Sequence, residues 1–202
     1  MDPLVILIVF GVIAIAELPD KSLFASLVLG TRYRASWVFT GVATAFLVHV
    51  IIAVAAGGAL TLLPRRALEV VVAVLFAGGA LVLLLGREEA EVGEGIGEGV
   101  DASRNLAASP SFRRVAMTSF GVVFIGEWGD ITQIATANYA ARYHDPVAVG
   151  IGATLALWAV AALAITAGKR VLDYVSVRLV RRVTGLILAA FAVLSAWSAI
   201  MG

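Results

Sequence analysis

Cysteine is absent from the 202 residues, histidine occurs only twice, and charged residues make up 14% of the chain. Without cysteine there is no disulfide and no thiolate metal site, so a bound metal would have to use oxygen or imidazole ligands. The scarcity of charge accompanies 61% hydrophobic residues and a mean hydropathy of +0.99. A globule of this length cannot bury so much apolar surface, which indicates an integral membrane protein. The net charge of +1 gives no sign of nucleic acid binding.

Six apolar stretches are long enough to cross about 30 Å of hydrocarbon, which takes roughly 20 helical residues. They cover residues 4–29, 36–63, 67–86, 115–140, 146–168 and 183–201. None shows the period-two alternation of barrel strands, so each stretch predicts a helix. The expected fold class is therefore an all-α membrane protein with six transmembrane helices.

Residues 87–112 interrupt this pattern with glycines, acidic residues and one proline. Such composition predicts a mobile, acidic, glycine-rich linker in the cytoplasm. Its acids lack the spacing of a calcium-binding loop, so a solvated tether is favoured over a cation site. The linker divides the chain into a first repeat at 1–86 and a second repeat at 113–202.

The positions of lysine and arginine set the expected orientation in the membrane, because cytoplasmic loops carry an excess of both. Eleven of these residues follow the first, third and fifth stretches, and three lie in the connections on the opposite side: Arg65, Arg66 and Arg142. The eleven-residue side is expected to face the cytoplasm. Both termini are then outside, and the expected location is a bacterial plasma membrane.

The two halves of the chain follow one plan, with corresponding residues 110 positions apart. The matching pairs are Glu17 with Glu127, Asp20 with Asp130, Ser22 with Thr132, Ser26 with Thr136, Gly11 with Gly121 and Thr44 with Thr154. Three spans per half is an odd number, so the second copy must enter the membrane in the opposite direction. Inverted repeats of this kind occur in many secondary transporters, whose sites lie near the midplane where the copies meet.

Four acidic residues fall at membrane depth, in "AELPDKS" and "GEWGDIT". Each acid at a helix centre costs roughly 2.5–3.5 kcal/mol on insertion scales, so the four need a partner. Within each motif the two acids are three positions apart and share one helix face, so two inverted helices can direct four carboxylates to one point. Hard divalent cations such as calcium, manganese and magnesium prefer oxygen cages of this kind. The candidate metal ligands are Glu17, Asp20, Glu127 and Asp130, with Ser22, Thr132 and Gln133 as additional oxygen donors.

The two hydroxyls lie about 200° around a regular helix from the aspartates of their motifs. Ser22 and Thr132 can reach the same ion only if each helix is broken nearby. Pro19 and Gly129 occupy corresponding positions and supply such breaks, by removing a backbone donor or by loosening the backbone.

Protons are expected to compete with the cation. When the cation leaves, four neighbouring carboxylates in a low dielectric cannot all stay ionised, so the empty site takes up protons. Filling the site expels them. This mutual exclusion is the minimum requirement for an antiporter.

The two motifs resemble the mark of the Golgi and bacterial calcium/manganese-proton antiporter family, E-x-G-D-[KR]-[ST], which occurs twice in a six-helix chain. Here the motifs read "ELPDKS" and "EWGDIT", so Pro19 replaces a glycine and Ile131 replaces a basic residue, while both acids of each motif remain. The resemblance covers nearly the whole chain. It implies an inverted-repeat transporter, with no prosthetic group, that exports manganese or calcium against protons.

Two other functions stay open at this point: a proton-coupled exporter of a small organic solute such as an amino acid, and a membrane scaffold. No nucleophile and base pair favours an enzyme. Lys21 is left open between snorkelling, pairing with an acid and a part in coupling. His49 could be a ligand or a proton relay, but a hydrogen-bonded packing role is favoured, because its counterpart 110 positions on is Ala159. The expected partners are the divalent cation, protons and membrane lipid, and assembly into a homo-oligomer is left open.

Overall fold

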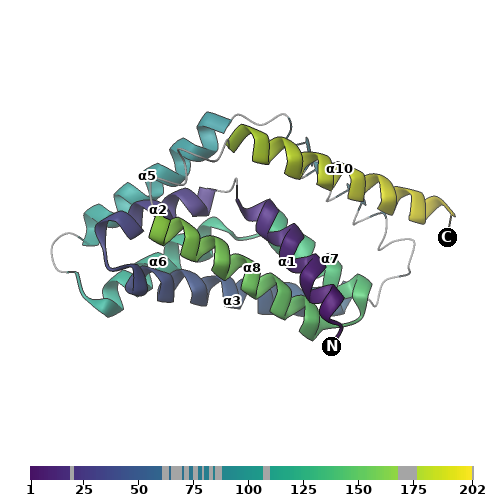
Figure 1. The fold of residues 1–202 in the computed structure, drawn as a ribbon, viewed down its shortest axis with the longest axis horizontal. Coiled ribbons are helices and arrows are strands. Elements are labelled where there is room, and N and C mark those ends of the chain that lie inside the picture. The colour runs from purple at the N-terminus through teal and green to yellow at the C-terminus, as the bar shows by residue number, and fades with distance from the viewer. Residues whose placement is uncertain are drawn as a thin grey trace.

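The computed structural model is helical throughout the residues that it describes (Figure 1). These residues are 1–18, 21–60, 88–106, 110–167 and 177–201, together with single positions between 64 and 84. The helices are α1 (Pro3–Glu17), α2 (Lys21–Arg32), α3 (Ala35–Leu60), α5 (Glu88–Leu106), α6 (Phe112–Gly126), α7 (Ile131–Tyr143), α8 (Pro146–Ala167) and α10 (Val177–Met201). The predicted all-α class is confirmed for this part of the chain.

Among the described helices, α3 and α8 are each long and apolar enough to cross a membrane alone. They correspond to the predicted spans 36–63 and 146–168. The predicted span 4–29 is divided into α1 and α2, whose axes differ by 76°, and this bent pair gives a third crossing if it is counted as one span. The stretch 115–140 is likewise divided, into α6 and α7. The stretch 183–201 falls in α10, and most of 67–86 lies outside the described residues, so six spans remain a prediction.

Helix ends are fixed by local side-chain hydrogen bonds. Asp2 precedes Pro3 and accepts a hydrogen bond from the Leu4 N–H at 2.9 Å, which caps α1. Ser111 caps α6 by accepting from the Arg114 N–H at 3.4 Å. These bonds supply partners for N–H groups that a helix leaves without one in its first turn.

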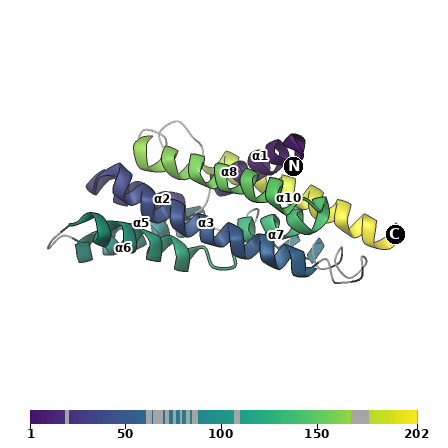
Figure 2. The ribbon, with the colours of Figure 1, turned by 90° about the horizontal axis from the view of Figure 1, so that it is seen from below.

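The first helix of each half packs on the long helix of the other half, α1 on α8 and α6 on α3 (Figure 2). Both contacts need a glycine. A Cβ atom at Gly152 would lie 2.7 Å from the Ile6 carbonyl oxygen, and one at Gly41 would overlap with the Ala116 carbonyl. Ile6 and Ala116 are 110 positions apart, as the repeat predicts, whereas Gly41 and Gly152 are 111 apart.

The one-residue difference has its origin in α7. α2 and α7 begin 110 positions apart, whereas α3 and α8 begin 111 apart, because α7 has 13 residues and α2 has 12. The connection before α8 contains His144, whose φ of 52° ends α7 in the left-handed conformation. The structural counterpart of His49 is therefore Val160, which is buried, and the pairing with Ala159, which is exposed, is wrong.

The second helices repeat this exchange between the halves. α2 packs on α8, where Gly30 lies against Ile165, and α7 packs on α3, where Gly57 lies against Ala140. Gly30 and Ala140 are again 110 positions apart. Small residues at these crossings let the helix backbones approach closely, as is common in membrane proteins.

Within the segment 87–112, for which the sequence predicts a mobile, solvated linker, residues 88–106 form α5. Four residues lie at helical spacing on the face of α5 that packs against its neighbours: Gly99, Ala102, Ser103 and Leu106. A Cβ at Gly99 would lie 2.7 Å from Val28 of α2. The Tyr33 hydroxyl also donates to the Ser103 carbonyl at 2.8 Å. The division of the chain at this segment remains a prediction.

Candidate metal centre

Both acidic motifs lie where a helix is interrupted. α1 ends at Glu17 and α2 begins at Lys21, while α6 ends at Gly126 and α7 begins at Ile131. Gly129 has a φ of +77°, a conformation that favours glycine, which is where the sequence predicted a break. Pro19 and Asp20 lie outside the described residues, as does the side chain of Lys21.

Three of the four predicted acids meet at one point. One carboxylate oxygen from each of Glu17, Glu127 and Asp130 lies within 4.8 Å of the other two. Glu17 and Glu127 are only 1% and 2% exposed, and Asp130 is half-buried. The two halves of the chain therefore direct acidic groups to one buried place, at the spacing that a small cation can bridge.

The hydroxyl of each motif points to a carboxylate. Ser22 Oγ donates to Glu17 Oε1 at 3.1 Å, and Thr132 Oγ1 donates to Asp130 Oδ2 at 2.6 Å. The other Asp130 oxygen accepts from the Gln133 N–H at 2.7 Å, so Asp130 also caps α7. These bonds orient the carboxylates, and they bring the predicted hydroxyls to the site beside the acids.

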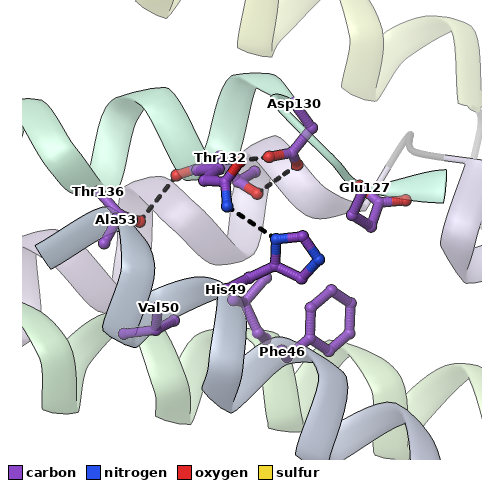
Figure 3. Close-up of a pocket in the computed structure, with 10 residues that line it drawn as sticks. Phe46, His49, Val50, Ala53, Glu127, Asp130, Thr132 and Thr136 are labelled. Carbon is purple, nitrogen blue, oxygen red and sulfur yellow. Dashed lines mark hydrogen bonds between the residues drawn. The ribbon is translucent and has the colours of Figure 1, made fainter. Parts of the chain in front are cut away.

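A small cavity adjoins Glu127 and Asp130 (Figure 3). Phe46, His49 and Val50 of α3 form one side, and Leu157 of α8 also lines it. The space open to a water-sized particle is about 10 Å³, which is room for roughly one water molecule. Six of the ten lining residues are polar, but apolar atoms form most of the surface that faces the cavity, so charge is poorly screened there.

Gln133 and His49 contact each other within this lining. Gln133 Nε2 lies 2.8 Å from His49 Nδ1, and Gln133 Oε1 accepts from the Gly129 N–H at 2.8 Å. His49 Nε2 lies 3.1 Å from the Phe124 carbonyl oxygen. The hydrogen-bonded role favoured for His49 from sequence is present, and His49 also lines the cavity beside the acids, which the sequence had ranked second. The one signal in the sequence was a lone imidazole in an otherwise apolar helix.

This arrangement is suited to binding a cation. Three carboxylates this close repel one another when ionised, and a divalent cation or bound protons relieve that repulsion. Among the described residues, the group that could hold a metal through His, Asp or Glu is this one.

Comparison with known proteins agrees with this geometry. The model of the family described as "Divalent cation/proton antiporter GDT1" matches residues 5–91 and 115–202. A GDT1-like protein of Synechocystis is 32% identical over 195 residues, covering 93% of this chain and 94% of that protein. GDT1-like protein 5 of Arabidopsis thaliana is 27% identical and covers 90% of each chain. The chloroplastic PAM71-homolog of Arabidopsis is 26% identical over 91% of this chain and 56% of its own length. No solved structure matches.

Proposed function

Because the chain belongs to the GDT1 family of divalent cation/proton antiporters, which are transporters and not enzymes, we propose that it exchanges manganese or calcium for protons. The observation that carries this proposal is the approach of Glu17 to Glu127 and Asp130. Acids from two distant parts of the chain share one buried point, where a bound cation or protons can offset their mutual repulsion.

The ion ligands in this proposal are the four acids of the two motifs: Glu17, Asp20, Glu127 and Asp130. Ser22 and Thr132 hold their carboxylates in place, since each hydroxyl donates to one of them. Gln133 completes the polar lining, with its amide oxygen directed at the Gly129 N–H. Loss of the cation leaves negative charges in apolar surroundings, so protons bind in its place.

Manganese and calcium fit this ligand set because both accept cages of carboxylate oxygen. The absence of cysteine removes the ligands that favour softer metals. An organic solute fits less well, because the cavity beside the acids has room for about one water molecule in this conformation. This difference in size favours the cation over the amino acid as substrate.

We further place the site between two inverted three-helix repeats in a six-span chain. The matched packing of α1 on α8 and of α6 on α3 supports this arrangement, because the first helix of each half packs on the long helix of the other half. The basic loops then face the cytoplasm and both termini lie outside. In a bacterial plasma membrane with an inward proton gradient, the exchange exports the cation.

Purified protein in liposomes with an imposed pH gradient tests the proposal. Addition of Mn²⁺ or Ca²⁺ should release protons from the acidic lumen, and a pH-sensitive dye inside the vesicles follows the release. Glycine or glutamate in place of the cation should give no flux. The proposal fails if neither cation stimulates proton movement, or if an amino acid does so and Mn²⁺ does not compete.

A further inference from the structure

A continuous chain of hydrogen bonds crosses the break between α6 and α7. It runs from the Gly129 N–H to Gln133 Oε1, from Gln133 Nε2 to His49 Nδ1, and from His49 Nε2 to the Phe124 carbonyl. Figure 3 draws His49 of α3 beneath the side chains of the break. The chain thus ties the last turn of α6, the break itself and the first turn of α7 to one residue of α3.

The direction of each bond follows from what each atom can do. A carbonyl oxygen only accepts, so His49 Nε2 carries a proton and donates it to Phe124. In the neutral ring Nδ1 then accepts, and its donor is the Gln133 amide nitrogen. This fixes the orientation of the Gln133 amide, whose oxygen accepts from the Gly129 N–H. Every donor and acceptor in the chain is used consistently.

The peptide group held by these hydrogen bonds, at Gly129, determines how the two acids of the motif are placed relative to each other. Gly129 lies between Glu127 and Asp130 and has a φ of +77°. A rotation there would move the two carboxylates relative to each other. His49 is 3% exposed and belongs to the long uninterrupted helix α3, so the chain is anchored on a rigid element.

The two corresponding positions of the other half are apolar. Leu23 occupies the position of Gln133, and Val160 occupies that of His49 in the structural register. Both residues are buried in one apolar cluster with Phe24 and Ala164. Among the described residues, a hydrogen-bonded chain of this kind is therefore found at the second motif.

We propose that His49 is a positioning residue of the cation site, which acts through Gln133 and Gly129 to hold Glu127 and Asp130 at their binding separation. This inference rests on the proposed function, since it assigns a role at the same site. Groups that orient metal ligands in this way typically change metal affinity about 10- to 100-fold when removed. The expected effect is on the cation concentration needed for half-maximal flux, because the ligands themselves remain.

The liposome assay with Mn²⁺ tests the proposal through three variants. His49→Leu removes both bonds, and Gln133→Leu gives the second half the residue found at Leu23. Each should raise the half-maximal Mn²⁺ concentration about tenfold with maximal flux within about twofold. The double variant should have the same half-maximal Mn²⁺ concentration as either single variant, because both substitutions break the same chain of hydrogen bonds.

A conservative variant separates positioning from simple packing. His49→Asn keeps an acceptor near the place of Nδ1 and should restore the half-maximal concentration to within about threefold of the unsubstituted protein. Thr44→Val is the matched control, since Thr44 is exposed on the same helix and bonds only the Thr40 carbonyl at 2.7 Å. The inference is overturned if His49→Leu leaves the concentration unchanged, or if Asn and Leu have equal effects.

Nitrogen NMR of the histidine rings gives a readout that does not depend on transport. The protein has two histidines, so ¹⁵N-histidine labelling of the His144→Asn variant leaves His49 as the one labelled ring. In alkaline buffer the proton should reside on Nε2, and Gln133→Leu should shift the Nδ1 resonance. An unshifted Nδ1 overturns the inference even if flux is normal. Inactive unsubstituted protein with the expected shift would instead overturn the proposed function alone.

Discussion

The break between α6 and α7 is held by hydrogen bonds to α3, whereas at the first motif Leu23 of α2 packs against Val160 of α8. Both arrangements bring a glutamate to the same point, with Glu17 and Glu127 almost fully buried. Hydrogen bonds fix direction as well as distance, while apolar contact is non-directional. Among the contacts of the described residues, those behind the second motif are therefore the more directional.

The comparison separates the features that both motifs share from those that are found at one motif. The acid and the hydroxyl beside it are present in both halves, although Ser22 donates to a glutamate and Thr132 to an aspartate. The groups behind them differ completely. Acidic groups from both halves of the chain thus converge, whereas the described side chains behind them differ.

The largest expected effect tests the feature that both motifs share, which is the buried glutamate. Glu17→Gln and Glu127→Gln each remove one charge from the cluster, and both should lower cation-driven proton flux about a hundredfold or more at subsaturating Mn²⁺. Asp101→Asn is the control, because Asp101 is an exposed acid on α5. Normal flux in either glutamine variant would show that the halves do not contribute equally.

The next effect concerns the helix crossings on which the site depends. Gly41→Val and Gly152→Val would push a side chain into the facing backbone and should each lower the free energy of unfolding by about 1–3 kcal/mol. Thermal unfolding in detergent measures this. Gly121→Ala, where a Cβ meets nothing within 4 Å, should be neutral or stabilising. A difference between the two valine variants would break the equivalence of the crossings.

Removal of the hydroxyls should have a smaller effect. Ser22→Ala and Thr132→Val each remove a donor to a carboxylate and should raise the half-maximal Mn²⁺ concentration about 3- to 10-fold. Thr132→Ser retains the donor and serves as the control. The shorter bond belongs to Thr132, so the second motif should be the more sensitive; the reverse order would contradict the view that it is held more tightly.

The smallest expected effect is a pH-dependent change in thermal stability. It compares the N-terminal ends of the two helix pairs, α1 with α8 and α6 with α3. Asp145 accepts from the Ala148 N–H at 3.1 Å and the Asp2 N–H at 2.9 Å, and these bonds hold its pKa below the ordinary value. The folded-state pKa is the lower one, so the stabilisation is present at neutral pH and is lost as pH falls through it. Asp145→Asn should therefore reduce thermal stability slightly at neutral pH, and the difference should disappear in acid below the folded-state pKa. The corresponding end of α3 and α6 uses a Trp37–Phe112 contact, and Phe112→Leu should act equally at both pH values.

Much of the site could be predicted because its signals are local. Acids in apolar stretches are conspicuous, and their recurrence 110 positions on predicted that Glu17 and Glu127 would meet. The break at Gly129 followed from the need to bring Thr132 to the same side as its aspartate. The long helices α3 and α8 followed from length and composition alone.

The remaining features depend on information that the sequence pattern does not carry. The glycines of α5 suggested a mobile linker, but Gly99, Ala102 and Ser103 form a small-residue face that packs on neighbouring helices. The predicted counterpart of His49 in the second half was wrong by one residue, because the extra residue before α8 cannot be located without the structure. Tertiary contact decided both.

Anomalous diffraction from crystals grown with Mn²⁺ tests the central claim most directly. We expect one strong manganese peak about 2.0–2.6 Å from carboxylate oxygens of Glu17, Glu127 and Asp130, with the peak lost in Glu127→Gln. A peak bound by acids of one half only, or by Asp101 of α5, would contradict the account.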